Sequence, residues 1–342
     1  MRHVNIPVFI PHLGCPNQCV FCNQREISGV REFQAEDVIP IIETALRTVE
    51  DDAEVEIAFF GGSFTGIDRN LMLSLLEIAN GYINKGVVSS IRCSTRPDYI
   101  DEDILGILKK YGVKTIELGL QSSSDEVLKS SKRGHNFEAE MKSCRLITEN
   151  GFNLVGQMMI GLPASDKTSE METARFIVDA GAVGARIYPT VVFRDTELCS
   201  MMLNGSYKPL TLDEAIERAA EVLDIFISAD VEVIRIGLQA SDNLSNPESS
   251  IAGANHPALG ELVIGEVYYK RICKLLFDSK ISENENITVL VSRGALSKAV
   301  GQNRKNKLRL MERYKNLRFA EAEGIPPYGV RLEINNGEMK CT

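Results

Sequence analysis

The sequence lacks any apolar run that approaches the ~20 residues needed to cross a bilayer. It also lacks low-complexity segments and short-period repeats, and its 44% hydrophobic and 25% charged residues are ordinary for a folded chain. A chain of 342 residues can hold one large domain with or without a small additional one. The segment before Cys15 is interrupted by two prolines and predicts a first strand, so we expect a cytoplasmic protein with no membrane partner.

Cysteines are too few for a disulfide scaffold, since there are eight in the whole chain. Three of them lie within eight residues near the N-terminus. The other five are scattered, and we expect them to be small buried apolar residues. These five are Cys93, Cys144, Cys199, Cys273 and Cys341.

Strand-like and helical patterns alternate along the first two thirds of the chain. The predicted strands are Val4–Phe9, Val55–Phe60, Ser90–Cys93, Thr115–Leu120, Leu154–Ile160 and Gly184–Tyr188. Between them lie helical stretches such as Asp68–Ile83 and Asp101–Tyr111. Six β-then-α units predict an α/β fold, in which a parallel sheet curls into a partial (β/α)6 barrel like part of a TIM barrel. The chemistry of such barrels lies at the C-terminal ends of the strands.

The pattern changes after residue 188. A helix (Thr211–Ser228) and a strand-like run (Val231–Ile236) are followed by a polar stretch rich in Gly, Asn and Ser. We therefore predict a barrel domain over 1–238 and a small α+β C-terminal domain over 239–342.

The three clustered cysteines are Cys15, Cys19 and Cys22, directly after the first strand. Thiolates favour soft metal centres. A zinc site would normally need a fourth protein ligand, and none lies nearby. Three cysteines suit a [4Fe–4S] cluster whose fourth iron has no protein ligand, whereas an accidental grouping of thiols is the alternative.

The spacing CxxxCxxC, with Phe21 before the last cysteine, resembles the cluster motif of the radical S-adenosylmethionine (radical SAM) superfamily. The resemblance implies that the open iron binds the methionine moiety of S-adenosylmethionine. Reduction of the cluster then cleaves this cofactor and generates a 5′-deoxyadenosyl radical, which abstracts hydrogen from a substrate. An external electron donor such as flavodoxin or ferredoxin is implied as a partner.

Gly61 and Gly62, at the end of the second strand, match the family's GGE motif, in which the backbone receives the cofactor's amino group. Ser63 stands where glutamate is most common. Further motifs in order are STRPDY from Ser94, ELGLQS from Glu117, KRGH from Lys132, MMIGLP from Met158 and IYPT from Ile187. Together they resemble the radical half of the catalytic subunit of Elongator, a tRNA-modifying enzyme, and more loosely oxygen-independent coproporphyrinogen oxidase.

Two features depart from the Elongator pattern. The first cysteine spacing here is the standard short one, and too few residues follow the barrel for an acetyltransferase domain. We therefore expect no acetyl-CoA bound in that way.

Several polar residues at strand ends are candidate cofactor contacts. Gln121 and Ser122 face the ribose or cap a loop, and Gln157 meets cofactor or substrate. Arg186 pairs with the cofactor or with Glu117.

Three further residues have alternative roles. Arg96 binds a carboxylate or pairs with Asp98. Cys93 is expected to pack in the core, with a pocket thiol as the alternative, and His135 is expected to be a loop residue rather than a catalyst.

A basic segment stands out on an acidic chain. Residues 293–318 carry a net charge of +8, although the whole chain carries −9. The segment predicts a β-α-turn-α-β unit that looks like a KH module, but with Arg304 in place of the second glycine of its GxxG loop. Arg304, Lys305, Lys307 and Arg309 would contact phosphates of tRNA or other RNA, unless the segment is only a solvated basic helix.

The sequence thus predicts a radical SAM enzyme that abstracts hydrogen, with a tRNA base as a candidate substrate. The alternative is a nucleic-acid-binding protein whose cluster is structural or redox-sensing. The strand-end motifs favour the enzyme, because a structural cluster would not need them.

Overall fold

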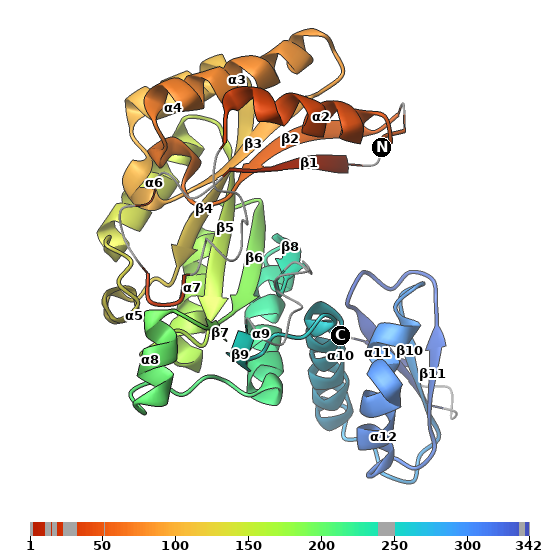
Figure 1. Ribbon diagram of the computed structural model, residues 1–342. Coiled ribbons are helices and arrows are strands. Elements are labelled where there is room, and N and C mark those ends of the chain that lie inside the picture. The colour runs from red at the N-terminus through yellow and green to blue at the C-terminus, as the bar shows by residue number, and fades with distance from the viewer. Residues whose placement is uncertain are drawn as a thin grey trace.

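The structure is a computed structural model that describes residues 3–10, 15, 19–22, 33–50, 52–238 and 250–334, with the backbone of 339–341. Its main element is a curled parallel sheet, seven-stranded in the described part of the chain (Figure 1). In the order in which they pair, the strands are β1 His3–Phe9, β2 Glu54–Phe60, β3 Ser90–Thr95, β4 Val113–Gln121, β5 Asn153–Ile160, β6 Gly184–Pro189 and β8 Glu232–Ile236. The predicted α/β partial barrel is confirmed, and β8 extends the six expected strands by one.

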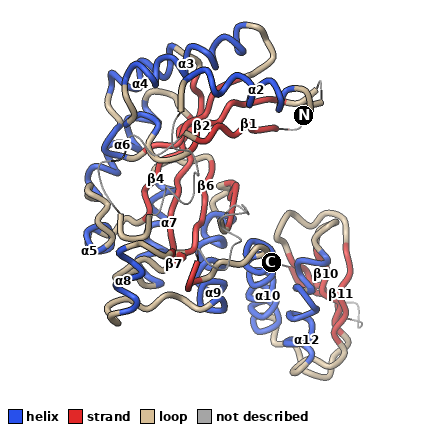
Figure 2. The backbone as a smooth tube through the Cα atoms, viewed as in Figure 1, coloured by secondary structure: helices blue, strands red, loops and turns tan. Residues whose placement is uncertain are grey.

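Helices cover the outer face of this sheet (Figure 2). They are α2 Val38–Leu46, α3 Arg69–Asn84, α4 Glu102–Lys110, α6 Phe137–Glu149, α7 Lys167–Asp179 and α9 Leu212–Ser228. Two shorter helices, α5 Asp125–Ser130 and α8 Glu197–Leu203, lie near the ends of the strands (Figure 1). Their boundaries follow local signals in the sequence. The Asp101 side chain accepts from Ile104 N at 2.8 Å and begins α4, as predicted.

Alternation along each strand gives the sheet two chemically different faces. The outer face is apolar, and Ile57, Ile91 and Ile116 are fully buried beneath the helices. The inner face carries polar and charged side chains, among them Glu56, Arg92 and Glu117. The functional groups of the barrel therefore project inward, from consecutive strands.

The C-terminal unit has its own sheet. Strands β10 Ile287–Val291, β11 Leu317–Glu321, β12 Val330–Ile334 and β13 Met339–Cys341 pair in the order β11-β10-β12-β13. Between β10 and β11 lie α11 Leu296–Val300, the short 3₁₀ helix η4 Gln302–Arg304 and α12 Lys305–Met311. The predicted β-α-turn-α-β order is present, with β10 and β11 parallel.

Helix α10 (Leu259–Asp278) joins the two parts of the molecule, and the C-terminal unit lies beside it (Figure 1). Its first half, including Val263, packs into the barrel core, and its second half, including Ile272, packs into a second core. Strand β9 (Ser250–Gly253) returns to the barrel and pairs with β7 (Val191–Phe193). The division after residue 238 stays a prediction, since 239–249 lie outside the described residues.

No helix among the described residues has the length and apolarity to cross a membrane. Of the scattered cysteines, Cys93 and Cys144 are buried, as expected, and Cys199 and Cys273 are half-buried. The Cys341 side chain lies outside the described residues.

Candidate cofactor site

The cysteine segment is held between two helices at the C-terminal edge of the sheet. Val20 N donates to Ser131 O at 3.2 Å, at the end of α5. Leu198 N, in α8, donates to Val20 O at 2.8 Å. Cys19 is buried, and the Cys15 and Cys22 side chains are half-buried. Residues 16–18 of the motif lie outside the described residues.

The Gly-Gly turn lies against the chain that leads into this segment. Gly61 has φ +96°, and a Cβ at this position would lie 2.2 Å from Ile10 O. Ile10 N donates to Phe60 O at 2.7 Å, which continues the pairing of β1 with β2. Only glycine allows so close an approach, so the turn brings the start of the cysteine segment and the end of β2 together.

One cavity of about 310 Å³ unites several of the predicted residues. Cys22, Gly61, Gly62, Gln157 and Arg186 line it. The rest of its lining is Phe9, Phe21, Phe60, Ser94, Glu117, Met159, Tyr188, Pro189, Val191, Phe193, Arg235 and Leu238. A mostly apolar wall with a few convergent polar groups is typical of a small-molecule site.

Three other predicted residues lie outside the lining of this cavity. The Ser63 hydroxyl bonds the Thr95 hydroxyl at 2.8 Å and so ties the Gly-Gly turn to β3. Ser122 Oγ accepts from Ser124 N at 3.2 Å. Gln121 is buried with φ +77°, and its Oε1 has no hydrogen-bond partner among the described residues. A buried amide oxygen in a strained conformation at a strand end suits a ligand-binding role.

A chain of buried charges crosses the inner face of the barrel. Glu117 receives Arg186 Nε at 2.7 Å and Nη2 at 2.9 Å, and it also receives Arg92 Nη1 at 2.9 Å. Arg92 Nε donates onward to Glu56 at 2.7 Å. Burial opposes the charge of Arg186, but the Glu117 carboxylate outweighs it and raises the pKa of Arg186.

Arg186 thus forms the predicted pair with Glu117, and its contact with the cofactor stays a prediction. The sequence reasoning did not single out Glu56 or Arg92. Their signal was present, since both are charged residues at inward positions of otherwise apolar strands.

The four basic residues predicted to bind phosphate lie in different surroundings. Arg304 is exposed with φ +62°, and Lys307 is half-buried. Lys305 pairs with Asp213 at 3.2 Å on the surface. Arg309 pairs with Glu266 at 2.7 Å and lies 3.5 Å from the centre of the Tyr269 ring. Two of the four are thus engaged by acidic residues outside the basic segment.

The donor set fits an iron–sulfur cluster chemically. Three cysteine side chains are present on one segment, and the sulfurs of Cys15 and Cys19 lie 3.6 and 3.9 Å from the same nitrogen, Arg96 Nη1. Among the described residues, no three His, Cys, Asp or Glu side chains meet in a geometry that would hold a single ion. The fit to a cluster rests on the donor chemistry, because cysteine thiolates are the ligands of iron–sulfur clusters.

Comparison with known families finds two adjoining matches. Residues 9–177 match the model of the radical SAM superfamily, and residues 182–269 match that of the radical SAM C-terminal domain.

Relatives in curated collections are similar over part of their length. A putative methylthiotransferase of Methanocaldococcus jannaschii is 28% identical over 64% of this chain and 52% of its own. A tRNA uridine(34) acetyltransferase of the same organism is 36% identical over 36% of this chain and 23% of its own. Elongator complex protein 3 of Homo sapiens is 26% identical over 50% of this chain and 35% of its own. The chain thus spans about half, or less, of the length of these relatives.

Among solved structures, archaeal Elp3 of Methanocaldococcus infernus aligns with a TM-score of 0.60 at 23% identity. The alignment covers 79% of this chain and 67% of that one. At this identity the likeness establishes the fold.

Proposed function

Because the chain belongs to the radical SAM superfamily, we propose that it binds a [4Fe–4S] cluster and S-adenosylmethionine and abstracts hydrogen from a substrate. In this proposal Cys15, Cys19 and Cys22 hold the cluster. Gly61, Gly62 and Gln157 contact S-adenosylmethionine in the cavity, and Ser63, Gln121 and Ser122 support the same site from strand ends.

The observation that carries the proposal is the shared cavity wall. Cys22 lines the same space as Gly61 and Gly62, although about forty residues separate them in sequence. A ligand in this space would therefore touch a thiol of the cysteine motif and an exposed backbone turn together. A cluster that served only the fold would need no such cavity beside it.

The bound cluster and S-adenosylmethionine supply electron transfer and radical generation. The protein's own groups bind, orient and exclude water. The Gly-Gly turn leaves backbone groups uncovered for a polar moiety, and the unpartnered Gln121 Oε1 can accept a hydrogen bond from a ligand. Phe9, Phe21 and Phe60 line the cavity and limit the access of water to it.

Arg186 has a different role in this proposal. Its guanidinium is oriented by Glu117 and faces the cavity, so it presents positive charge to a ligand without the freedom of a surface arginine.

We further propose a tRNA base as the substrate and an external flavodoxin or ferredoxin as the electron donor, in the cytoplasm. Support comes from relatives named as a tRNA uridine(34) acetyltransferase and as Elongator complex protein 3. The basic C-terminal unit, over 239–342 in our division of the chain, would hold the RNA through Arg304, Lys305, Lys307 and Arg309, as a KH-like module would. Arg304 and Lys307 are the members that no acidic partner engages among the described residues.

The experiment is a turnover assay under anaerobic conditions. Reconstituted protein with dithionite and S-adenosylmethionine should release 5′-deoxyadenosine, and addition of bulk tRNA should increase the yield. Cys19→Ala should abolish the product, because it removes a cluster ligand. Cys273→Ala, a half-buried cysteine in the second core, is the matched control and should retain the activity.

Failure of this assay has a defined meaning. If cluster-loaded, reduced protein releases no 5′-deoxyadenosine with tRNA or with a small-molecule extract, the non-catalytic alternative is favoured. If turnover responds to the extract and not to tRNA, the enzyme proposal stands and the tRNA substrate is wrong.

A further inference from the structure

Two buried arginines contact the sulfurs of the cysteine motif. Arg96 Nη1 lies 3.6 Å from Cys15 Sγ and 3.9 Å from Cys19 Sγ. Arg133 Nη1 lies 3.4 Å from Cys19 Sγ. Arg96 comes from the end of β3 and Arg133 from the loop after α5, so two separate elements direct guanidinium groups to the same thiols.

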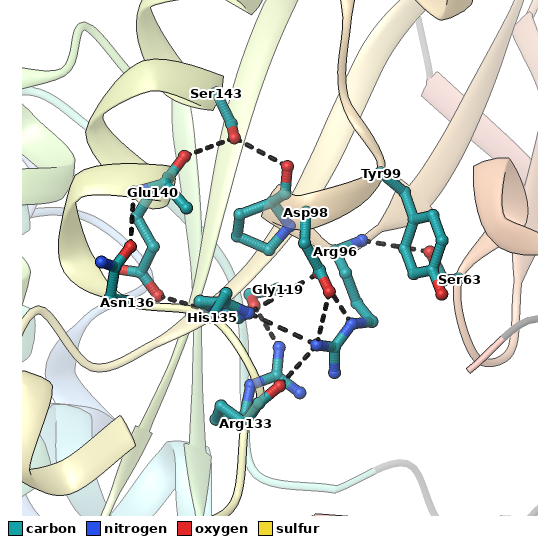
Figure 3. Close-up of polar contacts among 12 residues, drawn as sticks. Ser63, Arg96, Asp98, Tyr99, Gly119, Arg133, His135, Asn136, Glu140 and Ser143 are labelled. Carbon is teal, nitrogen blue, oxygen red and sulfur yellow. Dashed lines mark hydrogen bonds and ion pairs between the residues drawn. The ribbon is translucent and has the colours of Figure 1, made fainter. Parts of the chain in front are cut away.

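Both guanidinium groups also donate hydrogen bonds to oxygen atoms of the surrounding protein, which fix their positions (Figure 3). Asp98 receives Arg96 in a fork, with Nε–Oδ1 and Nη2–Oδ2 both 2.9 Å. Arg96 Nη2 also donates to Arg133 O, and Arg133 Nη2 donates to Gly119 O. The arginines are 4% and 6% exposed, so they are not surface charges that happen to lie near the thiols.

A second layer of buried polar groups supports Asp98. His135 Nδ1 lies 3.6 Å from Asp98 Oδ1, and His135 Nε2 lies 3.0 Å from Glu140 Oε1 (Figure 3). Burial alone would raise the pKa of Asp98, but His135 and Arg96 hold it well below its usual range. Asp98 therefore stays ionised and keeps Arg96 in place.

Burying this many charges is costly, and a hydrophobic packing of the same space would stabilise the fold at least as well. The structure gives them an orientation that fold stability does not require, since two of the donors are directed at sulfur. Hydrogen bonds to cluster sulfurs and nearby positive charge both favour the reduced, more negative cluster.

We propose that Arg96 and Arg133 are positioning residues that raise the reduction potential of the cluster. This inference rests on the proposed function, because it requires Cys15, Cys19 and Cys22 to hold the cluster. On reduction the cluster gains one electron from a low-potential donor, and the guanidinium pair stabilises the added negative charge. A guanidinium does not lose its proton in proteins, so this contribution persists across the physiological pH range.

The test is a redox titration of the reconstituted cluster, followed by its absorbance and EPR signal, without any turnover. Arg133→Gln should make reduction harder by about tenfold in equilibrium constant, which is about 59 mV for one electron. Arg133→Lys keeps the charge and should recover most of the loss. Arg145→Gln removes an exposed arginine on α6 and should leave the potential unchanged.

A variant of opposite sign separates electrostatics from damage to the fold. Asp98→Asn removes a negative charge but keeps a side-chain oxygen that accepts from Arg96, so Arg96 stays directed at the thiols. It should therefore shift the potential upward, while Arg133→Gln shifts it downward. A loss of packing would not shift the reduction potential in opposite directions in these two variants. Neither Arg133→Gln nor Asp98→Asn changes Arg96 itself. The two variants therefore keep the test decisive even if replacement of Arg96 by glutamine prevents cluster assembly.

Two results would overturn the inference. Unchanged potentials in Arg133→Gln and Asp98→Asn, with cluster content equal to wild type, would show that the arginines only pack the site. Reduction potentials that shift in the same direction in both variants would also show that the arginines only pack the site. Wild-type protein that binds no cluster would instead contradict the proposed function, and the inference with it.

Discussion

Charged side chains are buried and linked in the barrel interior, whereas they are exposed and paired singly on the C-terminal surface. Inside the barrel, Glu117 is 2% exposed and receives two arginines, so each charge depends on a shared partner. On the surface, Lys305 of the C-terminal unit and Asp213 of α9 form one isolated pair, with side chains 54% and 85% exposed. Linked buried charges are rigid and difficult to remove, whereas exposed pairs are screened by water and salt. The contrast separates a region built to hold a ligand precisely from one suited to adaptable contact.

The largest expected effect comes from breaking the buried network. Glu117→Ala should lower the free energy of unfolding by about 3–5 kcal/mol, because it leaves the buried Arg186 without a carboxylate and leaves Arg92 with Glu56 alone. Chemical denaturation measures this change. Asp213→Ala is the matched variant on the surface and should cost at most about 1 kcal/mol. Equal losses in the two variants would remove the contrast between the regions.

The next effect concerns the Gly-Gly turn. Gly61→Ala places a Cβ against Ile10 O and holds alanine at a φ of +96°, so it should weaken S-adenosylmethionine binding to cluster-loaded protein about tenfold or more. Calorimetric titration provides the affinity. Gly86→Ala imposes a similar φ of +73° in open space, so it controls for strain alone. Unaltered affinity in Gly61→Ala would mean that the turn does not touch the cofactor.

A third prediction uses the buried carboxyl of Glu140, on α6. Burial raises its pKa to about 7, against the opposing effects of His135 and Arg133, while Asp125 adds to the rise. Cys144 on the same helix is buried beside it, and its own thiol pKa is raised to about 12, by burial first and then by Glu140.

The raised pKa fixes the sign of the pH dependence. The folded protein holds the Glu140 proton more tightly than the unfolded chain, so this contribution to stability is complete below about pH 4.5 and lost as pH rises to about 7. The stability of wild type relative to Glu140→Gln should therefore fall across that window. Denaturation at several pH values checks this, and parallel curves would show that Glu140 does not titrate there.

The smallest expected effect is a loss of RNA affinity when the basic segment 293–318 is neutralised. Changing Arg304, Lys305 and Lys307 together to glutamine should weaken single-stranded RNA binding alike for all sequences. It should reduce the salt slope by at most about 2, because each phosphate contact contributes about 0.7 on single strands. Lys305 is already paired with Asp213, so we expect less than this maximum. Changing Lys109, Lys110 and Lys129 on the barrel is the charge-matched control, and an equal loss there would contradict a localised RNA site.

The sequence predicted the barrel well, because its strands are apolar runs with clear helix signals between them. The Asp101 cap and the order of units in the C-terminal sheet are examples. The proposed site was predicted from the cysteine motif and Gly61, since the roles proposed for them depend on spacing and backbone freedom. These are properties that a linear pattern records.

The polar network around the cysteines could not be read in the same way. Arg96, Arg133 and Glu140 meet only because β3, the loop after α5 and α6 pack together. His135 lies in the loop before α6, as predicted, but the sequence did not reveal that its side chain is 1% exposed and bonded to Glu140. Such long-range polar contacts have no local periodicity, so only the fold reveals them.

In the proposed site, three cysteines leave one iron of a cluster open beside the cavity. The most direct test of this arrangement is EPR spectroscopy of the reduced, reconstituted protein before and after addition of S-adenosylmethionine. We expect about four irons per chain and a signal that S-adenosylmethionine changes, since it would bind the open iron. A signal that S-adenosylmethionine leaves unchanged, or stoichiometric zinc in protein purified without oxygen, would contradict it.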